Sequence, residues 1–342
     1  MANTTRRPTL ADVAHRANVS ITSVSRLINH SGPINLETRA RIEAAMTELG
    51  FEPRASEPKE IPPTIAVITG SIMNSYFPEV IRGVQEEADS HNMLTLLFTL
   101  PTQAQRRQNI LEKLARRVAD GVVVMGSPVF PGLDDLQARL KLPMVVINRR
   151  YSGTALGSIT VDFENAGYRA TQHLLAFGHT RIGYIAPVEG VNDTLSSRRR
   201  GMEQAIRDAG LAINPQWMVS CPPSGESDSG FYAMNNLLRL PDERPTALVC
   251  FNDSIAVGVA HAIRAAGLRV PDDISIVSFG DIAVAAHACP PLTTISQPKY
   301  SIGMMAVQML RKMLQDPSAP GDIIETESPL VVRESTGPCP KR

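Results

Sequence analysis

The first fifty residues place apolar side chains three and four positions apart, the period of an α-helix, and contain no alternating segment typical of a strand. Three short helices are predicted: one capped by Thr9 with Asp12 in a capping box, one capped by Ser20, and one over residues 35–50. Asn18, between the first two, tolerates the left-handed backbone of a tight turn. Two short helices joined by such a turn and closed by a third form an all-α helix-turn-helix headpiece.

The hydrophobic pattern changes after these helices. Residues 51–63 contain four prolines and no apolar period, which predicts a linker. From residue 64 onward short apolar strands alternate with amphipathic helices, as in parallel sheets covered by helices on both faces. Strands are predicted at 65–69, 94–99, 121–125, 144–148, 159–162, 182–186, 247–251 and 274–279, and helices at 77–90, 105–117, 166–177, 197–209 and 254–266.

This many strand–helix units predicts two lobes rather than one sheet. We therefore divide the chain into a headpiece (1–50), a linker (51–63) and a two-lobed domain (64–342), with lobes at about 64–162 plus 292–325 and 163–291 plus 326–338.

Composition excludes several classes of protein. The 342 residues include 34 Lys and Arg against 34 Asp and Glu, and a net charge of zero argues against a protein that coats nucleic acid over its whole surface. Hydrophobic residues make up 43%, enough for a large core, but the apolar runs are far shorter than the ~20 residues of a membrane helix. Four scattered cysteines argue against a disulfide framework or zinc site, and the N-terminus shows no apolar signal segment, so we expect a cytoplasmic protein.

A small positive excess is concentrated at the N-terminus. Arg6, Arg7, Arg16 and Arg26 oppose only Asp12 within the first thirty residues. The second predicted helix carries small hydroxyls, an amide and Arg26 away from its apolar face, which suits a helix in a major groove, where arginine can donate two hydrogen bonds to guanine. An ordinary solvated face is the alternative; the local basic excess favours DNA binding.

The segments TLADVAHRANVSITSVSRLIN and TRARIEAAMTELGFEP resemble the headpiece of the LacI/GalR family of bacterial transcription regulators. The resemblance continues through VDFENAGYRATQHLLAFGHTRIGYIA, RRRGMEQAIRDAGL, FNDSIAVGVAHAIRAAGLRVPDDISIVSFGD and CPPLTTISQP. It implies a headpiece hinged to an α/β domain of two lobes with parallel sheets, like a periplasmic binding protein. It also implies a homodimer on a palindromic operator in double-stranded DNA, with an effector in the interlobe cleft that alters operator affinity.

The resemblance assigns DNA contacts by position. Ile21, Thr22 and Arg26 fall where the family reads bases, and Ile21 can pack on a thymine methyl. The phosphate contacts fall on Thr9, Ser20, Ser23, Ser25 and Asn29.

The resemblance also assigns an effector site. Its residues are Tyr76, Phe77, Asn148, Arg198, Asn252, Asp281, Gln297 and Lys299. Helix capping is the alternative role at Asp253, and the protein core is the alternative place for Phe77. Gly280 stands where sugar-binding members often have aspartate, and Lys299 where many have an apolar residue. Arg198 with Lys299 would favour an anion, so we expect a sugar acid such as gluconate or ketogluconate, with a neutral sugar or nucleobase as the alternative.

The linker departs from the family pattern. Arg54 replaces an asparagine, the usual minor-groove leucine is missing, and Glu57, Pro58 and Glu60 lie where a hinge helix would run. Proline interrupts helices and carboxylates repel phosphates, so we expect weaker DNA bending or an altered hinge.

Enzyme motifs are missing from the sequence: it contains no G-x-G-x-x-G, Walker A, H-E-x-x-H or G-x-S-x-G pattern. The histidines show no metal-ligand spacing, and His173 and His179 are interpreted as structural, so we expect no cofactor and no metal. A solute-binding protein without DNA function is the remaining alternative, which the headpiece opposes. The tail lacks leucine heptads, which favours a dimer. We expect a repressor of catabolic genes that its effector releases from DNA.

Overall fold

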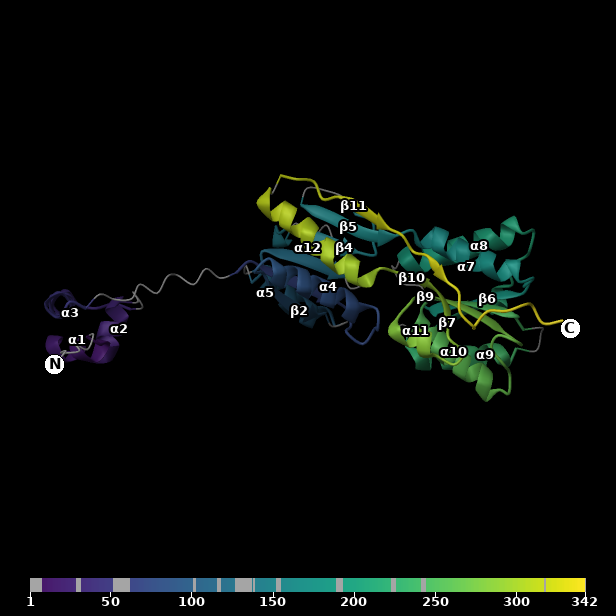
Figure 1. Ribbon diagram of the computed structural model, residues 1–342, viewed down its shortest axis with the longest axis horizontal. Coiled ribbons are helices and arrows are strands. Elements are labelled where there is room, and N and C mark those ends of the chain that lie inside the picture. The colour runs from purple at the N-terminus through teal and green to yellow at the C-terminus, as the bar shows by residue number, and fades with distance from the viewer. Residues whose placement is uncertain are drawn as a thin grey trace, which may run out of the picture. The chain divides into compact units, whose positions relative to one another are not determined.

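Figure 1 shows the computed structural model of the chain. It describes residues 8–28, 32–51, 62–100, 103–115, 118–126, 137, 139–151, 155–188, 193–222, 226–240, 244–316 and 318–341. The chain divides into two units, Met1–Ile61 and Pro62–Arg342, and each is described by itself. Most of the predicted linker, with Arg54, Glu57, Pro58 and Glu60, lies outside the described residues.

The first unit contains the three predicted helices, α1 (Leu10–Ala17), α2 (Ile21–Ile28) and α3 (Leu36–Leu49). Thr9 caps α1 in the predicted capping box: Thr9 N donates to the Asp12 carboxylate at 2.7 Å, and Asp12 N donates to Thr9 Oγ1 at 3.4 Å. Asn18 ends α1 in left-handed backbone with φ of 49°, and Ser20 Oγ accepts from Ser23 N at 3.1 Å where α2 begins. The predicted helices, caps and turn are confirmed.

A small apolar core holds the three helices together. Its buried members are Val13, Ala14, Ala17, Val24, Ile42 and Ala45. Arg41 on α3 adds a polar contact, since its Nη2 donates to the carbonyl oxygens of Ala17 at 2.6 Å and Asn18 at 2.8 Å. This contact fixes the tight turn against α3, and the turn sets the direction of α2.

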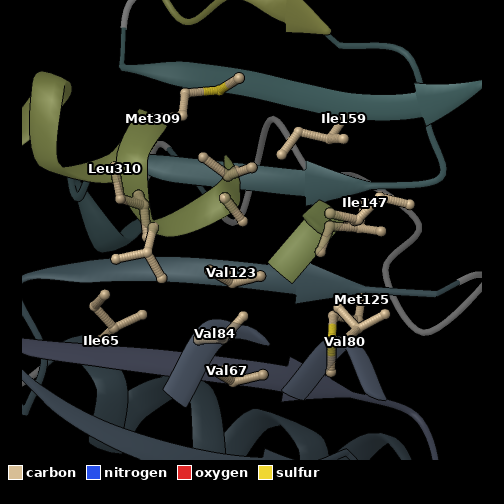
Figure 2. Close-up of a cluster of buried hydrophobic side chains, with 14 of the residues drawn as sticks. Ile65, Val67, Val80, Val84, Val123, Met125, Ile147, Ile159, Met309 and Leu310 are labelled. Carbon is tan, nitrogen blue, oxygen red and sulfur yellow. The ribbon is translucent and has the colours of Figure 1, made fainter. Parts of the chain in front are cut away.

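The first lobe of the second unit is a six-stranded sheet in the order β11-β5-β4-β3-β1-β2, with every pair parallel. Its strands are β1 (Thr64–Thr69), β2 (Leu94–Thr99), β3 (Gly121–Met125), β4 (Met144–Ile147), β5 (Leu156–Val161) and β11 (Ile323–Thr326). Alternate residues of β1 face opposite sides of the sheet. Ile65 and Val67 pack in a hydrophobic core with side chains of α4 (Phe77–Ser90) and α12 (Lys299–Gln315), as Figure 2 shows. Ala66 and Ile68 join the opposite core beneath α5 (Ala104–Ala115). With this period of two, the strands β1, β3, β4 and β5 are buried on both faces of the sheet.

The second lobe repeats this design with the order β12-β10-β9-β8-β6-β7, parallel except for β12 against β10. Its strands are β6 (Ile182–Pro187), β7 (Met218–Cys221), β8 (Ala247–Cys250), β9 (Ser275–Gly280), β10 (Thr293–Ser296) and β12 (Leu330–Val331). Its helices are α7 (Phe163–Ala176), α8 (Asp193–Asp208), α9 (Ser227–Leu238), α10 (Asp253–Ala265) and the short α11 (Ala283–His287). Figure 1 shows α7 and α8 on one face of this sheet and α9 and α10 on the other. Ala247 and Val249 of β8 pack beneath α7 and α8, whereas Leu248 and Cys250 pack beneath α9 and α10.

The chain passes between the lobes three times, and the second passage differs from the prediction. The sequence placed the return to the first lobe at residue 292, but β10 pairs with β9 and belongs to the second lobe. Buried Thr293 and Thr294 explain the difference, because both hydroxyls bond partners within that lobe. The passage therefore comes at Gln297 and Pro298, directly before α12.

Two absences hold for the described part of the chain. No helix there is long and apolar enough to cross a membrane. No group of three or more His, Cys, Asp or Glu side chains there is placed to hold a metal ion.

The C-terminal tail packs on the second lobe around His179, which is fully buried. Its Nδ1 lies 3.0 Å from Thr246 Oγ1, and its Nε2 lies 3.0 Å from both Ser275 Oγ and the carbonyl oxygen of Gly337. Burial lowers the pKa of His179 below its usual 6.5. The ring therefore folds neutral and holds the tail, as the structural interpretation predicted.

A pH effect on stability follows from this histidine. Because the folded-state pKa of His179 lies below the unfolded value, its contribution is present above about pH 6.5 and is lost as pH falls toward the folded pKa. We expect His179→Gln to reduce the loss of unfolding free energy between pH 7.5 and 5.5, measured by urea denaturation. The exposed His287→Gln serves as control, and equal pH slopes for the wild type and His179→Gln would contradict the assignment.

Candidate DNA-binding face and ligand site

The outer face of α2 presents the three predicted base-reading residues. Ile21 is 53% exposed, and Thr22 and Arg26 are exposed, whereas Val24 between them is fully buried. Within residues 8–28 and 32–51, Arg26 has neither an ion pair nor a hydrogen bond, so its guanidinium is available to a ligand. The fold thus brings an apolar group, a hydroxyl and an arginine onto one exposed surface.

The other described arginines of the headpiece are engaged within it. Arg16 pairs with Glu48, Arg39 pairs with Glu43 at 2.8 Å, and Arg41 holds the turn described above. The positive charge predicted for the first thirty residues is therefore reduced, because Glu48 of α3, which lies outside those residues, pairs with Arg16. The predicted contributors Arg6 and Arg7, and the predicted phosphate contact Asn29, lie outside the described residues.

The predicted phosphate contacts differ in how free their hydroxyls are. Thr9 Oγ1 donates its proton to Asp12 at 2.6 Å, so it lacks a free donor for phosphate in this arrangement. Ser20 Oγ and Ser23 Oγ lie 2.9 Å apart and share one hydrogen bond, which leaves one of the two protons for another acceptor. Ser25 is half-buried on the same helix.

Arg198 on α8 is the most unusual polar group of the second unit. It is 5% exposed, and its guanidinium carbon lies 4.5, 4.4 and 4.8 Å from the ring centres of Phe163, Phe251 and Phe279. Its Nη1 donates to the Phe251 carbonyl oxygen at 2.6 Å, but its buried Nε finds no partner among the described residues. Burial lowers the pKa of Arg198 to about 10, while Tyr184, Tyr76 and the carboxylate of Asp253 act in the opposite direction. The group stays charged at neutral pH, and its Nε–H remains an unused donor.

Two glycines set the position of Arg198 against the rings. A Cβ on Gly167 of α7 would lie 2.2 Å from the Arg198 carbonyl oxygen, and one on Gly201 of α8 would lie 1.9 Å from the Glu164 carbonyl oxygen. Only glycine allows the two helix backbones to approach this closely. The close crossing brings Arg198 to Phe163, which is the first residue of α7.

Tyr76 of the first lobe lies close enough to Arg198 for the two groups to act on each other electrostatically. Tyr76 is 9% exposed, and its hydroxyl donates to Asn148 Oδ1 at 3.5 Å, a long hydrogen bond. Burial raises the pKa of Tyr76 to about 12, and Asn148 and Arg198 act to lower it. Asn148 follows β4 in left-handed backbone, with φ of 65°. The structure therefore brings Tyr76, Asn148 and Arg198 together between the lobes.

Phe77 belongs mainly to the core, the alternative that the sequence left open. It packs edge-on against Tyr76, with ring centres 5.5 Å apart, within the first-lobe core. A Cβ on Gly126 would lie 2.6 Å from Phe77 Cζ, so the ring fills the space at the end of β3.

The polar pair after β8 has roles that the sequence did not distinguish. Asn252 caps α10, since its Oδ1 accepts from Ile255 N at 2.8 Å. Asp253, for which capping was the alternative role, is fully buried instead. Its carboxylate accepts from Ser278 Oγ at 2.5 Å, Thr294 Oγ1 at 2.6 Å and Ile282 N at 2.9 Å. It is thus a buried anion that joins α10 to β9 and β10.

Lys299 does not present its charge to a ligand, contrary to the expectation. The side chain is 4% exposed, and Nζ donates to the carbonyl oxygens of Gly280 at 2.7 Å and Asp281 at 2.9 Å. The Gln297 carbonyl oxygen lies 3.4 Å from Nζ, and Glu79 Oε2 lies 3.5 Å away. All three ammonium protons therefore have acceptors inside the protein.

The remaining two predicted effector residues differ from each other. Asp281 turns its carboxylate to Arg333, whose Nη2 lies 2.7 Å from Oδ1. Gln297 is 4% exposed, and its Oε1 is buried with no hydrogen-bond donor in the described ranges. Gln297 and Arg198 thus supply an unused acceptor and an unused donor.

A separate pocket of about 430 Å³ lies beside the passage from β11 to β12. Its lining is Asp162, Asn165, Arg169, Glu325, Thr326, Glu327, Ser328 and Pro329. Asp162 caps α7 and Glu325 pairs with Arg150 at 2.8 Å, so two of its carboxylates have partners. None of the predicted effector residues lines this pocket.

The sequence missed the groups that surround Arg198 and Lys299. Phe163, Phe251 and Phe279 each stand at or next to the end of a predicted strand or helix, and this position was the available signal. Glu79 lies in the first turn of α4, where a carboxylate is ordinarily explained by the helix dipole.

Comparisons with known proteins agree with this architecture. Residues 9–54 match the family model "Bacterial regulatory proteins, lacI family", and residues 171–336 match "Periplasmic binding protein-like domain". The chain is 33% identical to the HTH-type transcriptional repressor PurR of Photobacterium profundum over 96% of this chain and 98% of that protein. It is 32% identical to the ribose operon repressor of Haemophilus influenzae over the same shares. The solved transcriptional regulator CelR–cellobiose complex matches with a TM-score of 0.72 and 27% identity, covering 96% of this chain and all of that one.

Proposed function

The chain belongs to the lacI family of bacterial regulatory proteins and is a DNA-binding repressor rather than an enzyme, and we propose that its effector is an uncharged nucleobase or sugar. In this proposal the α2 face reads a palindromic operator, and the effector binds between the lobes at Arg198. Effector binding shifts the relative populations of lobe arrangements and thereby alters operator affinity.

The observation that carries the proposal is charge balance in the site. The Lys299 ammonium is shared among three carbonyl oxygens and Glu79, and the buried Asp253 carboxylate acts on Arg198. Of the two cations on which the sugar-acid expectation rested, Lys299 is therefore paired inside the protein, and Arg198 is the one that keeps an unused donor. An added carboxylate would then have one cation rather than two to offset its desolvation, which is costly. This favours the neutral alternative over gluconate or ketogluconate.

The aromatic surroundings of Arg198 support the same class of ligand. Phe163 and Phe279 are buried against the guanidinium, and the half-buried Phe251 offers ring surface on which a base or the apolar face of a sugar can stack. Arginine donates well to carbonyl and ring-nitrogen acceptors of a purine, as it does in nucleic-acid recognition. The names of two relatives refer to ribose and cellobiose, which are neutral sugars.

A thermal-shift screen of the full chain tests the effector. Hypoxanthine, guanine, ribose and cellobiose are compared with gluconate and ketogluconate. We expect a neutral compound to raise Tm, because a ligand at 100 times its Kd adds about 2.7 kcal/mol of stability. Arg198→Met should abolish the shift, whereas Arg200→Met should retain it, since exposed Arg200 pairs with Glu164. A shift by a sugar acid alone would overturn the proposal.

We also propose that this chain forms the homodimer that a palindromic operator requires, through the edge strand β2. Leu94 and Leu96 are 49% and 36% exposed on one face of β2, and Leu97 is 45% exposed on the other. An edge strand with exposed leucines is prone to pairing unless a partner covers it. In a two-fold symmetric dimer, the same strand of a second copy of the chain would cover β2.

The dimer is tested by light scattering after size-exclusion chromatography. Leu96→Lys places a charge on the β2 face and is expected to yield monomers that still unfold cooperatively. Val332→Lys, at a residue that is 56% exposed near β12, is the matched control and should remain dimeric. A dimeric Leu96→Lys protein would place the interface elsewhere.

A further inference from the structure

Lys299 lies where the chain passes from the second lobe to the first. Its backbone belongs to the first lobe, and its ammonium group contacts the second. It is the first residue of α12, which packs on the first-lobe sheet and on α4. The packing is close, because a Cβ on Gly303 would lie 2.2 Å from the Val80 carbonyl oxygen. The backbone that carries Lys299 is therefore held by the first lobe.

The ammonium of Lys299 reaches the second lobe. Its two shortest hydrogen bonds, at 2.7 and 2.9 Å, go to the carbonyl oxygens of Gly280 and Asp281 at the end of β9. These residues have φ of 129° and 52°, the left-handed region that directs carbonyl groups away from the ordinary strand path. The exit of β9 is fixed further by Ile282 N, which donates to Asp253 at 2.9 Å.

Glu79 brings the first lobe to the same ammonium. Its Oε2 lies 3.5 Å from Lys299 Nζ, and it stands in α4 three residues after Tyr76. One buried cation thus contacts a carboxylate of the first lobe and two carbonyl groups of the second. Tyr76, which is close enough to Arg198 for the two groups to act on each other electrostatically, directly precedes the same helix.

We propose that Lys299 is a positioning residue that ties the exit of β9 to α4 and thereby sets the separation of the two lobes, and with it the distance from Tyr76 to Arg198. The tie combines hydrogen bonds to neutral carbonyl groups with a partly exposed ion pair. Because an ion pair of this exposure contributes little alone, the carbonyl bonds carry the larger share. The consequence for effector affinity rests on the proposed function, whereas the effect on lobe separation does not.

Interlobe distances measured by pulsed electron spin resonance test the tie. The full chain carries nitroxide labels at Asp89→Cys on α4 and Arg264→Cys on α10, both exposed, with Cys289→Ser and Cys339→Ser removing the accessible thiols. Dilution with excess unlabelled chain removes distances between protomers. We expect Lys299→Met to broaden or shift the distance distribution most and Glu79→Gln to do so less.

The matched control is Glu86→Gln. Glu86 is also on α4 and accepts from Tyr300 on α12 at 2.6 Å, but this contact lies within the first lobe. It should leave the distribution unchanged. An unchanged distribution in a cooperatively folding Lys299→Met chain would overturn the proposal, as would an equal effect of Glu86→Gln. If Lys299→Met does not fold, Glu79→Gln takes its place, and a distance distribution unchanged from that of the wild type would overturn the proposal.

A ligand measurement separates this inference from the proposed function. Ribose and hypoxanthine are used as probes, and the probe that stabilises the wild type is chosen for the comparison. We expect Lys299→Met to raise the Kd of this probe at least fivefold and Glu86→Gln to leave its Kd unchanged. If no neutral probe binds the wild type, the proposed effector class is wrong. The distance measurements would still test the role of Lys299 in lobe separation.

Discussion

Replacing Asp253 by alanine is expected to lower the free energy of unfolding of the second unit by about 3–5 kcal/mol. The carboxylate accepts from two buried hydroxyls and one backbone N–H, and these donors lie on β9, just after its end and on β10, at Ser278, Ile282 and Thr294. Alanine leaves all three donors unpaired in a region with no exposure to water, and each such group costs about 1–3 kcal/mol. It also removes the anion that acts on Arg198.

The neighbouring residue provides the control. Asn252→Ala removes the cap of α10, a change that costs about 1 kcal/mol. Urea denaturation of both variants at neutral pH should therefore give a clearly larger loss for Asp253→Ala. A loss no greater than that of Asn252→Ala would show that water or a rearranged side chain replaces the carboxylate, and the role given to Asp253 would be wrong.

Arg26→Ala is expected to weaken binding to the preferred operator by about 1–3 kcal/mol per half-site, the value of a bidentate contact to a base. Arg26 lies on the exposed face of α2 and makes no contact within the described part of the headpiece that would compete with DNA. Its removal takes away sequence discrimination as well as affinity. The headpiece should remain folded, because the side chain is exposed and outside the core.

The measurement requires an operator selected from random palindromic DNA with the wild-type chain. Fluorescence anisotropy then compares this operator with unrelated DNA of the same length across a range of salt concentrations. Arg39→Ala is the matched control, since Arg39 is bound to Glu43 on α3, and its operator affinity should change little. Equal losses on operator and unrelated DNA would make Arg26 a phosphate contact rather than a base reader.

The sequence was a good guide where structure depends on local periodicity. The strand at 94–99 and the helix at 77–90 agree residue for residue with β2 and α4, and the caps at Thr9 and Ser20 form as predicted. The helix α12 was not predicted, although its buried residues recur at helical spacing from Ile302 to Met313. The periodicity that indicates this helix is therefore present in the sequence.

The sequence was a weaker guide to the charges of the site because their partners are distant along the chain. Lys299 was interpreted as a free cation, yet its acceptors lie at Gly280, Asp281 and Glu79. No local sequence pattern shows that Glu79 contacts Lys299, because this contact depends on how α4 packs against α12. The type of residue at a site was therefore predictable, but the charge that it presents to a ligand was not.

The three passages between the lobes have a consequence for synthesis of the protein. The first lobe needs α12 to cover its core and β11 to complete the sheet beside β5, and along the chain α12 begins about 140 residues and β11 about 160 residues after β5 ends. At ~5–20 residues per second, that interval is roughly ten to thirty seconds, during which the nascent first lobe exposes the apolar face of α4. The headpiece completes its own core as soon as α3 has emerged, and so it folds long before the domain that regulates it.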